Sequence, residues 1–316
     1  MSVALLDRRL LFVTGKGGVG KTTVAAALGL LAAREGRRTL VCEVDAKGNL
    51  ADFYEIARPG FTPRQVQPNL NVMAMNTEES LKEYLSLQLK IPLIARIGPL
   101  ARTFDFLANA APGVKEILTV GKLGWEVRER HYDLVVVDAP ATGHIVGQLR
   151  APQAINELVK VGLVRDQTGW LMDILGDPAQ TGVVITASPE EMPVVESLEL
   201  IDRLKAETDV EVASIVVNRV LPELFGRGEE EVFERLREPE HVAALVSAVG
   251  APVEPVLDAA RLAVTLRRTR AGHLARLRAG VDPTLPILYV PELFARGHGL
   301  RATNQVADAL GAELGF

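Results

Sequence analysis

The sequence predicts a doubly wound α/β fold, in which helices cover both faces of a mostly parallel sheet. Short apolar runs alternate along the chain with longer amphipathic segments, as strands alternate with helices in such folds. The runs at residues 10–13 and 134–137 are apolar throughout, which is typical of strands buried on both faces. Both ends of the chain follow this alternation, and 48% of the 316 residues are hydrophobic, which is enough for a large core.

The periodicity places each element. We expect strands at residues 10–14, 39–44, 71–75, 133–137, 182–186, 212–218 and 287–290. We expect helices at residues 23–35, 77–89, 93–107, 113–130, 189–207, 229–249, 255–279 and 301–314, and a largely helical stretch at 145–176. The connection before residue 133 is far longer than a crossover needs. We therefore predict one domain over residues 1–316, with helical insertions at about 77–130 and about 145–180.

A glycine-rich segment, residues 15–23, lies between the first apolar run and the first expected helix. It reads GKGGVGKTT and matches the pattern G-x-x-x-x-G-K-[ST], in which backbone N–H groups converge on phosphate oxygens. Lys21 would neutralise the phosphates, and the Thr22 hydroxyl would bind Mg²⁺. The candidate nucleotide-binding residues of this phosphate loop are Gly15, Gly17, Gly18, Val19, Gly20, Lys21, Thr22 and Thr23. The predicted ligands are ATP and Mg²⁺.

Polar side chains follow three of the other expected strands. Asp138 ends the most apolar strand, an arrangement in which the acid supports Mg²⁺. Asp45 ends the strand at 39–44 and would hold a metal-bound water or orient the attacking water, unless it only forms a turn. Asn218 would pair with adenine or serve as a plain turn residue. The candidate metal-binding residues are thus Thr22, Asp45 and Asp138. The segment at residues 139–144 is expected to be a loop that rearranges with the γ-phosphate.

Composition restricts the class of protein. The net charge of −5 gives no support to nucleic-acid binding, and no nucleic-acid partner is expected. The single cysteine, Cys42, excludes a disulfide framework or a multi-cysteine metal site within one chain. Residues 1–9 contain no signal-peptide core, and no apolar run approaches the roughly 18 residues of a membrane span. We expect a cytoplasmic protein, with attachment to the periphery of a membrane as an open alternative.

The expected helices around residues 77–107 carry apolar residues in steps of three and four. These residues are Leu81, Leu85, Leu93, Ile97, Leu100, Phe104 and Leu107. They form either a packing face or a groove for an apolar client, and the small number of Met residues, 5, favours packing. The arginines at 267, 268, 270, 276 and 278 form a solvated helix face or a surface for an anionic partner.

A second lysine in the phosphate loop, Lys16, indicates a particular branch of such proteins. The segment KGGVGKTT resembles the deviant phosphate loop of the nitrogenase iron protein, of Min and partition ATPases, and of arsenite-pump and tail-anchored-protein targeting ATPases. Together with Asp45, Asp138, Thr142-Gly143-His144, Asn218 and Pro291, the loop resembles the arsenite-pump (ArsA) family of anion-transporting ATPases over nearly the whole chain.

The resemblance implies a role for each matching residue. Lys16 would act across a dimer interface on the partner's nucleotide, and Asp45 in the first switch would position the attacking water. Thr142-Gly143-His144 would form the second switch. The catalytic candidates are therefore Lys16 and Asp45. Asn218 and the backbone after Pro291 would hold adenine. The resemblance also implies a homodimer, or a heterodimer with a related ATPase subunit.

The chain departs from the family pattern at the first switch, which reads Asp45-Ala46-Lys47-Gly48-Asn49 where the family usually has proline after the acid. The cysteines of the targeting factor's zinc site and of arsenite binding are also absent. We therefore expect a Mg²⁺-dependent ATPase that drives a conformational switch coupled to an apolar client or membrane protein. The alternatives are a non-hydrolysing ATP-binding scaffold subunit and a Min- or partition-type ATPase.

Overall fold

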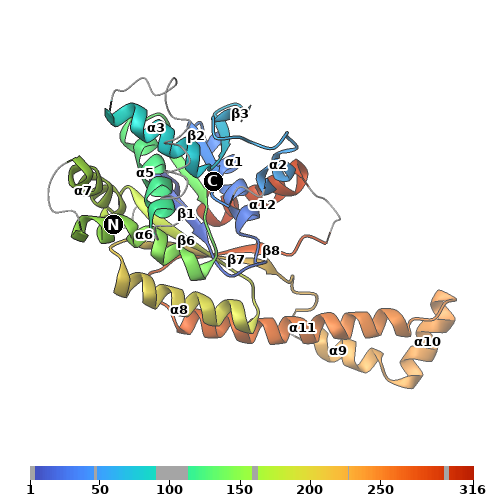
Figure 1. Cartoon of the computed structure of the whole chain (residues 1–316). Coiled ribbons are helices and arrows are strands. Elements are labelled where there is room, and N and C mark those ends of the chain that lie inside the picture. Colours follow the sequence, from blue (N-terminus) through green and yellow to red (C-terminus); the bar gives the residue numbers. More distant parts are fainter. Residues whose placement is uncertain (1–3, 46–47, 90–112, 159–162, 227, 295–298) are drawn as a thin grey trace.

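The computed structural model describes residues 4–45, 48–89, 113–158, 163–226, 228–294 and 299–316 (Figure 1). Their centre is an eight-stranded sheet in the order β3-β4-β2-β5-β1-β6-β7-β8. The strands are β1 (Leu10–Thr14), β2 (Thr39–Glu43), β3 (Arg64–Gln67), β4 (Leu70–Ala74), β5 (Leu134–Asp138), β6 (Thr181–Ala187), β7 (Val212–Val220) and β8 (Ile287–Pro291). All neighbouring strands run parallel except β3, which pairs antiparallel with β4 at one edge.

Helices cover both faces of this sheet (Figure 1). They are α1 (Lys21–Arg34), α2 (Asn49–Tyr54), α3 (Thr77–Leu89), α5 (Val114–Arg128), α6 (Thr142–Leu158), α7 (Leu163–Gly176), α8 (Glu191–Glu207), α9 (Glu229–Leu236), α10 (Pro239–Val249), α11 (Glu254–Ala279) and α12 (Leu300–Leu314). The predicted doubly wound α/β fold with a mostly parallel sheet is confirmed.

The core forms two layers because successive side chains of a strand point to opposite faces. Leu10 and Phe12 of β1 pack with α5, α6, α7 and α8 on one face. Leu11 and Val13 pack with α1, α2 and α12 on the other. All five residues of β1 are buried, as expected for a central parallel strand. This double burial fixes the positions of the strand ends from which the site is built.

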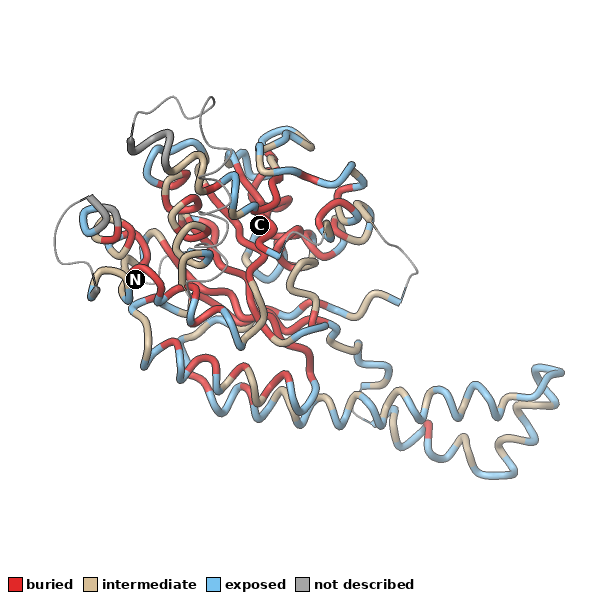
Figure 2. Tube along the Cα trace, viewed as in Figure 1, coloured by how far each residue is buried: buried red, intermediate tan, exposed pale blue. Residues whose placement is uncertain are grey.

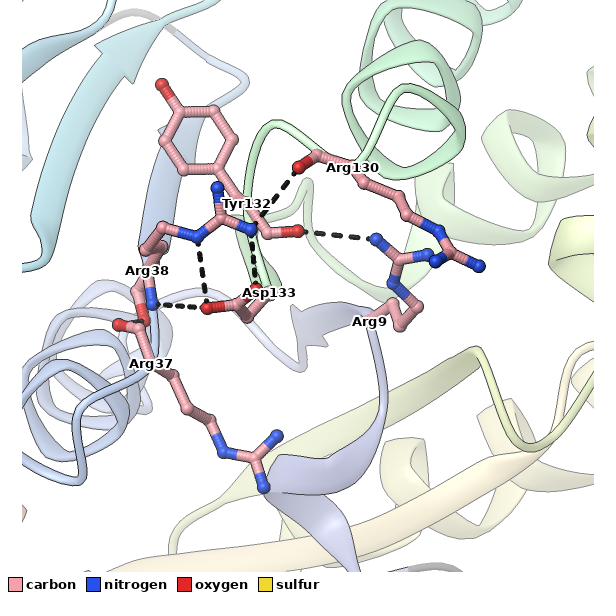
Figure 3. Close-up of polar contacts among 7 residues, drawn as sticks. Arg9, Arg37, Arg38, Arg130, Tyr132 and Asp133 are labelled. Atoms are coloured by element: carbon pink, nitrogen blue, oxygen red, sulfur yellow. Dashed lines mark hydrogen bonds and ion pairs between the residues drawn. The ribbon is translucent and has the colours of Figure 1, made fainter.

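The edge of the sheet where the strands begin is held by arginines and one aspartate (Figure 3). The guanidinium of Arg38 donates to Asp133 at 2.8 Å, and its backbone N–H donates to the same carboxylate at 2.9 Å. These hydrogen bonds lower the pKa of Asp133. Arg9 donates to the carbonyl oxygen of Tyr132 at 3.4 Å. The contacts join the starts of β1, β2 and β5, at the edge opposite the phosphate loop.

The structure corrects several details of the sequence prediction. The strand β3 and the helix α2 were not predicted. Residues 142–144 form the first turn of α6 rather than a loop, because the backbone becomes helical at Thr142. The expected helix at 93–107 lies outside the described residues. The same holds for five of the seven apolar residues that were proposed to form a packing face or a groove. The division into one domain with two insertions remains a prediction.

Candidate nucleotide-binding site

The phosphate loop connects the buried strand β1 to α1 and is packed against the ends of β6 and β7. Gly15 has φ +149°, and a Cβ there would lie 2.1 Å from the carbonyl oxygen of Thr186. Gly20 has φ +96°, and a Cβ there would lie 2.3 Å from Nδ2 of Asn218. A side chain at either position would collide with neighbouring atoms and strain the backbone. The glycines therefore bring the loop backbone close to the strand ends.

The residues predicted for the phosphates and the metal converge at the start of α1. The Thr22 hydroxyl donates to Oδ2 of Asp138 at 2.7 Å, and Nζ of Lys21 donates to the carbonyl oxygen of Lys16 at 3.3 Å. Burial raises the pKa of Asp138 to about 6, although the Thr22 hydrogen bond and the charge of Lys21 lower it. A carboxylate that is costly to ionise without a cation is suited to a site that receives one.

An open pocket of ≈ 1070 Å³ lies over this point, at the carboxyl ends of the strands. Ligands of open α/β sheets bind at this edge. The predicted residues that line the pocket are Gly17, Gly18, Gly20, Lys21, Thr22, Thr23, Asp45, Asn218 and Pro291. The structure thus brings together predicted residues from four separate parts of the sequence. Gly15, Lys16, Val19 and Asp138 are not among the lining residues.

The donor set of the pocket fits Mg²⁺. The Thr22 hydroxyl and the Asp138 carboxylate offer oxygen atoms, which Mg²⁺ prefers. Asp45 follows β2, lines the pocket and is exposed. The negative charge of Asp45 contributes to the raised pKa of Asp138. Two carboxylates and a hydroxyl are therefore available to hold a hydrated divalent cation, directly or through water.

Lys16 occupies a different position from Lys21. Its ammonium group forms an ion pair with Glu196 of α8 in the same chain. The other carboxylate oxygen of Glu196 accepts a hydrogen bond from the Thr142 hydroxyl at 3.2 Å. The backbone N–H of Thr142 in turn donates to the carbonyl oxygen of Gly15 at 3.3 Å. Glu196 therefore connects the phosphate loop with the predicted second switch, a role that the sequence analysis missed.

Asn218, predicted to pair with adenine, also anchors the phosphate loop. Its Nδ2 donates to the carbonyl oxygen of Val19 at 2.9 Å, and its Oδ1 accepts from the backbone N–H of Arg219 at 3.0 Å. Asn218 is buried, with 6% of its surface exposed, and it still contributes to the pocket lining together with Pro291. The structure places both residues at the pocket, and the adenine contact itself remains a prediction.

A buried glutamate supports the first switch. Glu43 ends β2, is 1% exposed, and accepts hydrogen bonds from the backbone N–H groups of Gly48 and Asn49 at 3.2 and 2.9 Å. These bonds tie the start of α2 to the sheet just beyond Asp45. The sequence contained a usable signal, because a charged residue within a buried strand requires polar partners.

A second cavity, of ≈ 260 Å³, lies among α3, α5, α6 and α7. Its lining is largely apolar and includes Leu81, Tyr84, Ile117, Trp125, Ile155 and Trp170. Leu81 belongs to the predicted apolar face. The cavity is on the face of the sheet that α5, α6, α7 and α8 cover, and none of its lining residues lines the nucleotide pocket.

The loop between β1 and α1, with its lysine, its threonine and an acid at the end of β5, defines a phosphate-loop ATPase. A model of the anion-transporting ATPase (ArsA) family matches residues 8–172 and 164–242, and the chain belongs to this family. The predicted resemblance is confirmed. Family membership makes the protein an ATP-hydrolysing enzyme, which contradicts the scaffold alternative.

The chain is similar to several curated proteins. It is 30% identical over 304 residues to the ATPase BagA of Mycobacterium tuberculosis, covering 90% of this chain and 86% of that protein. It is 27% identical over 247 residues to a putative arsenical pump-driving ATPase of Aquifex aeolicus, covering 68% of this chain and 81% of that one. It is 26% identical over 254 residues to an ATPase ASNA1 homolog of Entamoeba dispar, covering 67% and 76%.

Among the described residues, no helix combines the length and the apolar character that a membrane crossing requires.

Proposed function

We propose that this ATPase hydrolyses Mg²⁺-bound ATP at the interface of two subunits and uses the cycle to switch conformation for an apolar client. The observation that carries the proposal is the Thr22–Asp138 hydrogen bond of 2.7 Å beside Lys21. The pocket over this contact also includes Asp45 and Asn218. Phosphate, metal and base candidates are therefore arranged along one ligand-sized pocket.

Each residue has a distinct role in this proposal. Lys21 and the loop N–H groups bind the phosphates, and Thr22 and Asp138 hold Mg²⁺ directly or through water. Bound Mg²⁺ would neutralise negative charge on the phosphate oxygens. Asp45, which also lines the pocket, orients the attacking water. Asn218 and the backbone after Pro291 receive the adenine.

Lys16 supports the two-subunit part of the proposal. Lys21 already serves the phosphates of its own loop, whereas Lys16 points to α8 and is paired with Glu196. About one third of the Lys16 side chain is exposed, so a change of partner does not require the core to open. We propose that Lys16 leaves Glu196 and reaches the nucleotide of a second subunit, either a second copy or a related ATPase chain. A positive charge supplied in this way acts as an arginine finger does.

The apolar cavity among α3, α5, α6 and α7 supports an apolar client. Its walls include Trp125, Trp170 and Ile117, and aromatic and aliphatic walls of this kind bind apolar groups. α6 begins at Thr142, which contacts Glu196, so α6 connects the cavity to the second switch. We propose that movement at Thr142 changes the cavity. The client would be an apolar segment or a membrane protein, handled in the cytoplasm or at the periphery of a membrane.

Two variants test the nucleotide site. Lys21→Ala is expected to lose most ATP affinity by calorimetry, since it removes the charge that offsets the phosphates. Asp45→Asn is expected to bind ATP and to lose at least about 100-fold in turnover in the presence of Mg²⁺.

The matched control is Asp52→Asn, because Asp52 is also an exposed carboxylate on the wall of the same pocket. Its turnover should stay close to that of the wild type. If Asp45→Asn kept full turnover, or if both variants lost it equally, the role proposed for Asp45 would be wrong.

A further inference from the structure

A helical arm projects from the domain and has almost no core of its own (Figure 1). We define the arm as residues 228–266, which comprise α9, α10 and the first half of α11. Phe233 is the buried residue of this segment, stacked against Phe225 at 4.8 Å between ring centroids. Figure 2 shows the rest of the arm as exposed or intermediate. Exposed apolar residues that gather on such an extension indicate an interaction site.

The position of the arm follows from the contacts at its root. Arg267 donates a hydrogen bond to the carbonyl oxygen of Leu221. Arg270 donates to the carbonyl oxygen of Arg219 at 3.3 Å and lies 3.8 Å from the Glu292 carboxylate. Arg219 and Glu292 both line the nucleotide pocket. Residues 267–270 of α11 therefore lie at the carboxyl edge of the sheet. The residues of α11 before 267 extend beyond that edge by about 20 Å, at 1.5 Å per residue.

A second subunit would have to lie beside the arm. This step rests on the proposed function, in which Lys16 reaches the nucleotide of a partner. Since the phosphate loop and the nucleotide pocket are at the carboxyl edge, the two subunits must face each other across these edges. Each arm then projects past its own edge toward the partner, and a two-fold axis makes the two arms antiparallel.

The surface of the arm suits such a contact. One side of α11 carries an apolar seam with steps of three and four residues: Val256, Ala259, Leu262 and Leu266. Three of these residues are large and clearly exposed, at 69%, 60% and 44% for Val256, Leu262 and Leu266. Exposed apolar positions with this spacing are typical of a helix that packs against another helix.

The charges of the arm and its root are complementary in the antiparallel arrangement. Residues 238–258, at the far end, contain four carboxylates and no Lys or Arg. Residues 261–278, toward the root, contain six arginines and no carboxylate. Arg267, Arg268 and Arg270 already have carboxylate partners within the chain. The acidic end disfavours an anionic membrane surface as the occupant, since such a surface attracts Lys and Arg.

We propose that the arm is an interaction surface for a second copy of this chain, packed antiparallel along the seam at 256–266 while ATP is bound. The acidic end of each arm then faces the arginine-rich root of the other. Contacts of α11 with Arg219 and Glu292 link this interface to the nucleotide pocket.

Crosslinking tests the geometry. The one cysteine of the sequence, Cys42, is fully buried in the core, so an introduced cysteine gives a clean signal. Leu262→Cys should crosslink to itself with a short bismaleimide in the presence of Mg²⁺ and a non-hydrolysable ATP analogue. Glu129→Cys is the control, since Glu129 is exposed at the opposite edge of the sheet, and it should not crosslink. Equal crosslinking at both positions would contradict the proposal.

Sedimentation distinguishes failure of this inference from failure of the proposed function. The double variant Leu262→Ser and Leu266→Ser changes only exposed side chains and should still fold and bind ATP. It should require at least 10-fold more protein than the wild type to form dimers with the analogue. Equal dimerisation would overturn the arm interface but leave the two-subunit site intact. If the wild type itself stayed monomeric, the two-subunit site would fail as well. Loss of binding to phosphatidylglycerol vesicles, with dimerisation unchanged, would assign the arm to a membrane and overturn the proposal.

Discussion

We predict that Lys122 is held in a buried ion pair whose loss is costly. The ammonium of Lys122 lies 2.6 Å from Glu126 and 2.8 Å from Glu83. The side chains of Lys122 and Glu126 are only 7% and 6% exposed. Burial alone would lower the pKa of Lys122, but its hydrogen bonds to Glu126 and Glu83 raise the pKa above the ordinary value. Lys122 and Glu83 also line the apolar cavity, so they form part of the wall proposed to contact a client.

Replacing Lys122 by Met leaves the carboxylate of Glu126 buried without its cation. The expected loss in the free energy of unfolding is about 3 kcal/mol, the lower end for a broken buried pair, because His131 still contacts Glu126 at 2.7 Å. The double variant Lys122→Met with Glu126→Gln removes both charges. It should return to within about 1 kcal/mol of the wild type.

Urea denaturation of Lys122→Met, Glu126→Gln and the double variant measures the coupling free energy between the two residues. Lys82→Met is the matched control, because Lys82 pairs with Glu78 and Glu79 on the neighbouring helix α3 but is 44% exposed. That variant should lose less than about 1 kcal/mol. If Lys122→Met cost no more than Lys82→Met, or if the two changes at 122 and 126 were additive, the reasoning from burial would be refuted.

Two further predictions concern the site, and a third concerns the buried cysteine. Burial raises the pKa of Asp138 from 3.8 to about 6. The contribution of this group to the free energy of unfolding is therefore fully present below pH 3.8 and is lost as the pH rises through 6. Asp138→Asn should therefore be up to about 3 kcal/mol more stable than the wild type at pH 7 in EDTA, and no more stable at low pH, by urea denaturation. Glu196→Gln should free Lys16 and lower the protein concentration for half-maximal ATPase activity. The expected change is up to about fivefold, which corresponds to the interaction free energy of a partly exposed ion pair. A rise in that concentration would show that Glu196 assists the dimer. Burial also raises the pKa of the Cys42 thiol, so it should react with a thiol reagent only after unfolding, and rapid reaction of the native protein would contradict its placement.

Much of the sheet could be predicted because its central strands are apolar on both faces. Residues 10–13 and 134–137 have no polar side chain, and the structure buries all of them. β3 escaped prediction because it is a four-residue edge strand, RQVQ, with two exposed residues, and an edge strand needs no apolar run. α2 is only six residues long and follows the glycine at 48, so periodicity gives too short a signal.

The candidate site divides in the same way. The phosphate loop and the acid at the end of β5 could be predicted because their spacing follows from local backbone geometry. The contact between Lys16 and Glu196 joins residues 180 positions apart, and no local pattern on α8 identifies Glu196. The arm was predicted as helices at 229–249 and 255–279, but periodicity cannot show that it extends past the edge of the sheet. Such long-range placement depends on the tertiary structure.

A mixture of two inactive variants tests most directly whether two subunits share each catalytic site. Lys16→Ala removes the lysine supplied to the partner, and Asp45→Asn removes the group that orients water in the chain's own site. In a mixed dimer, the Lys16→Ala chain keeps Asp45 and receives Lys16 from its partner. An equal mixture should therefore recover about one quarter of wild-type turnover, since about half of the dimers are mixed and each has one restored site. If sedimentation confirmed mixed dimers and no turnover returned, Lys16 would not act across the interface.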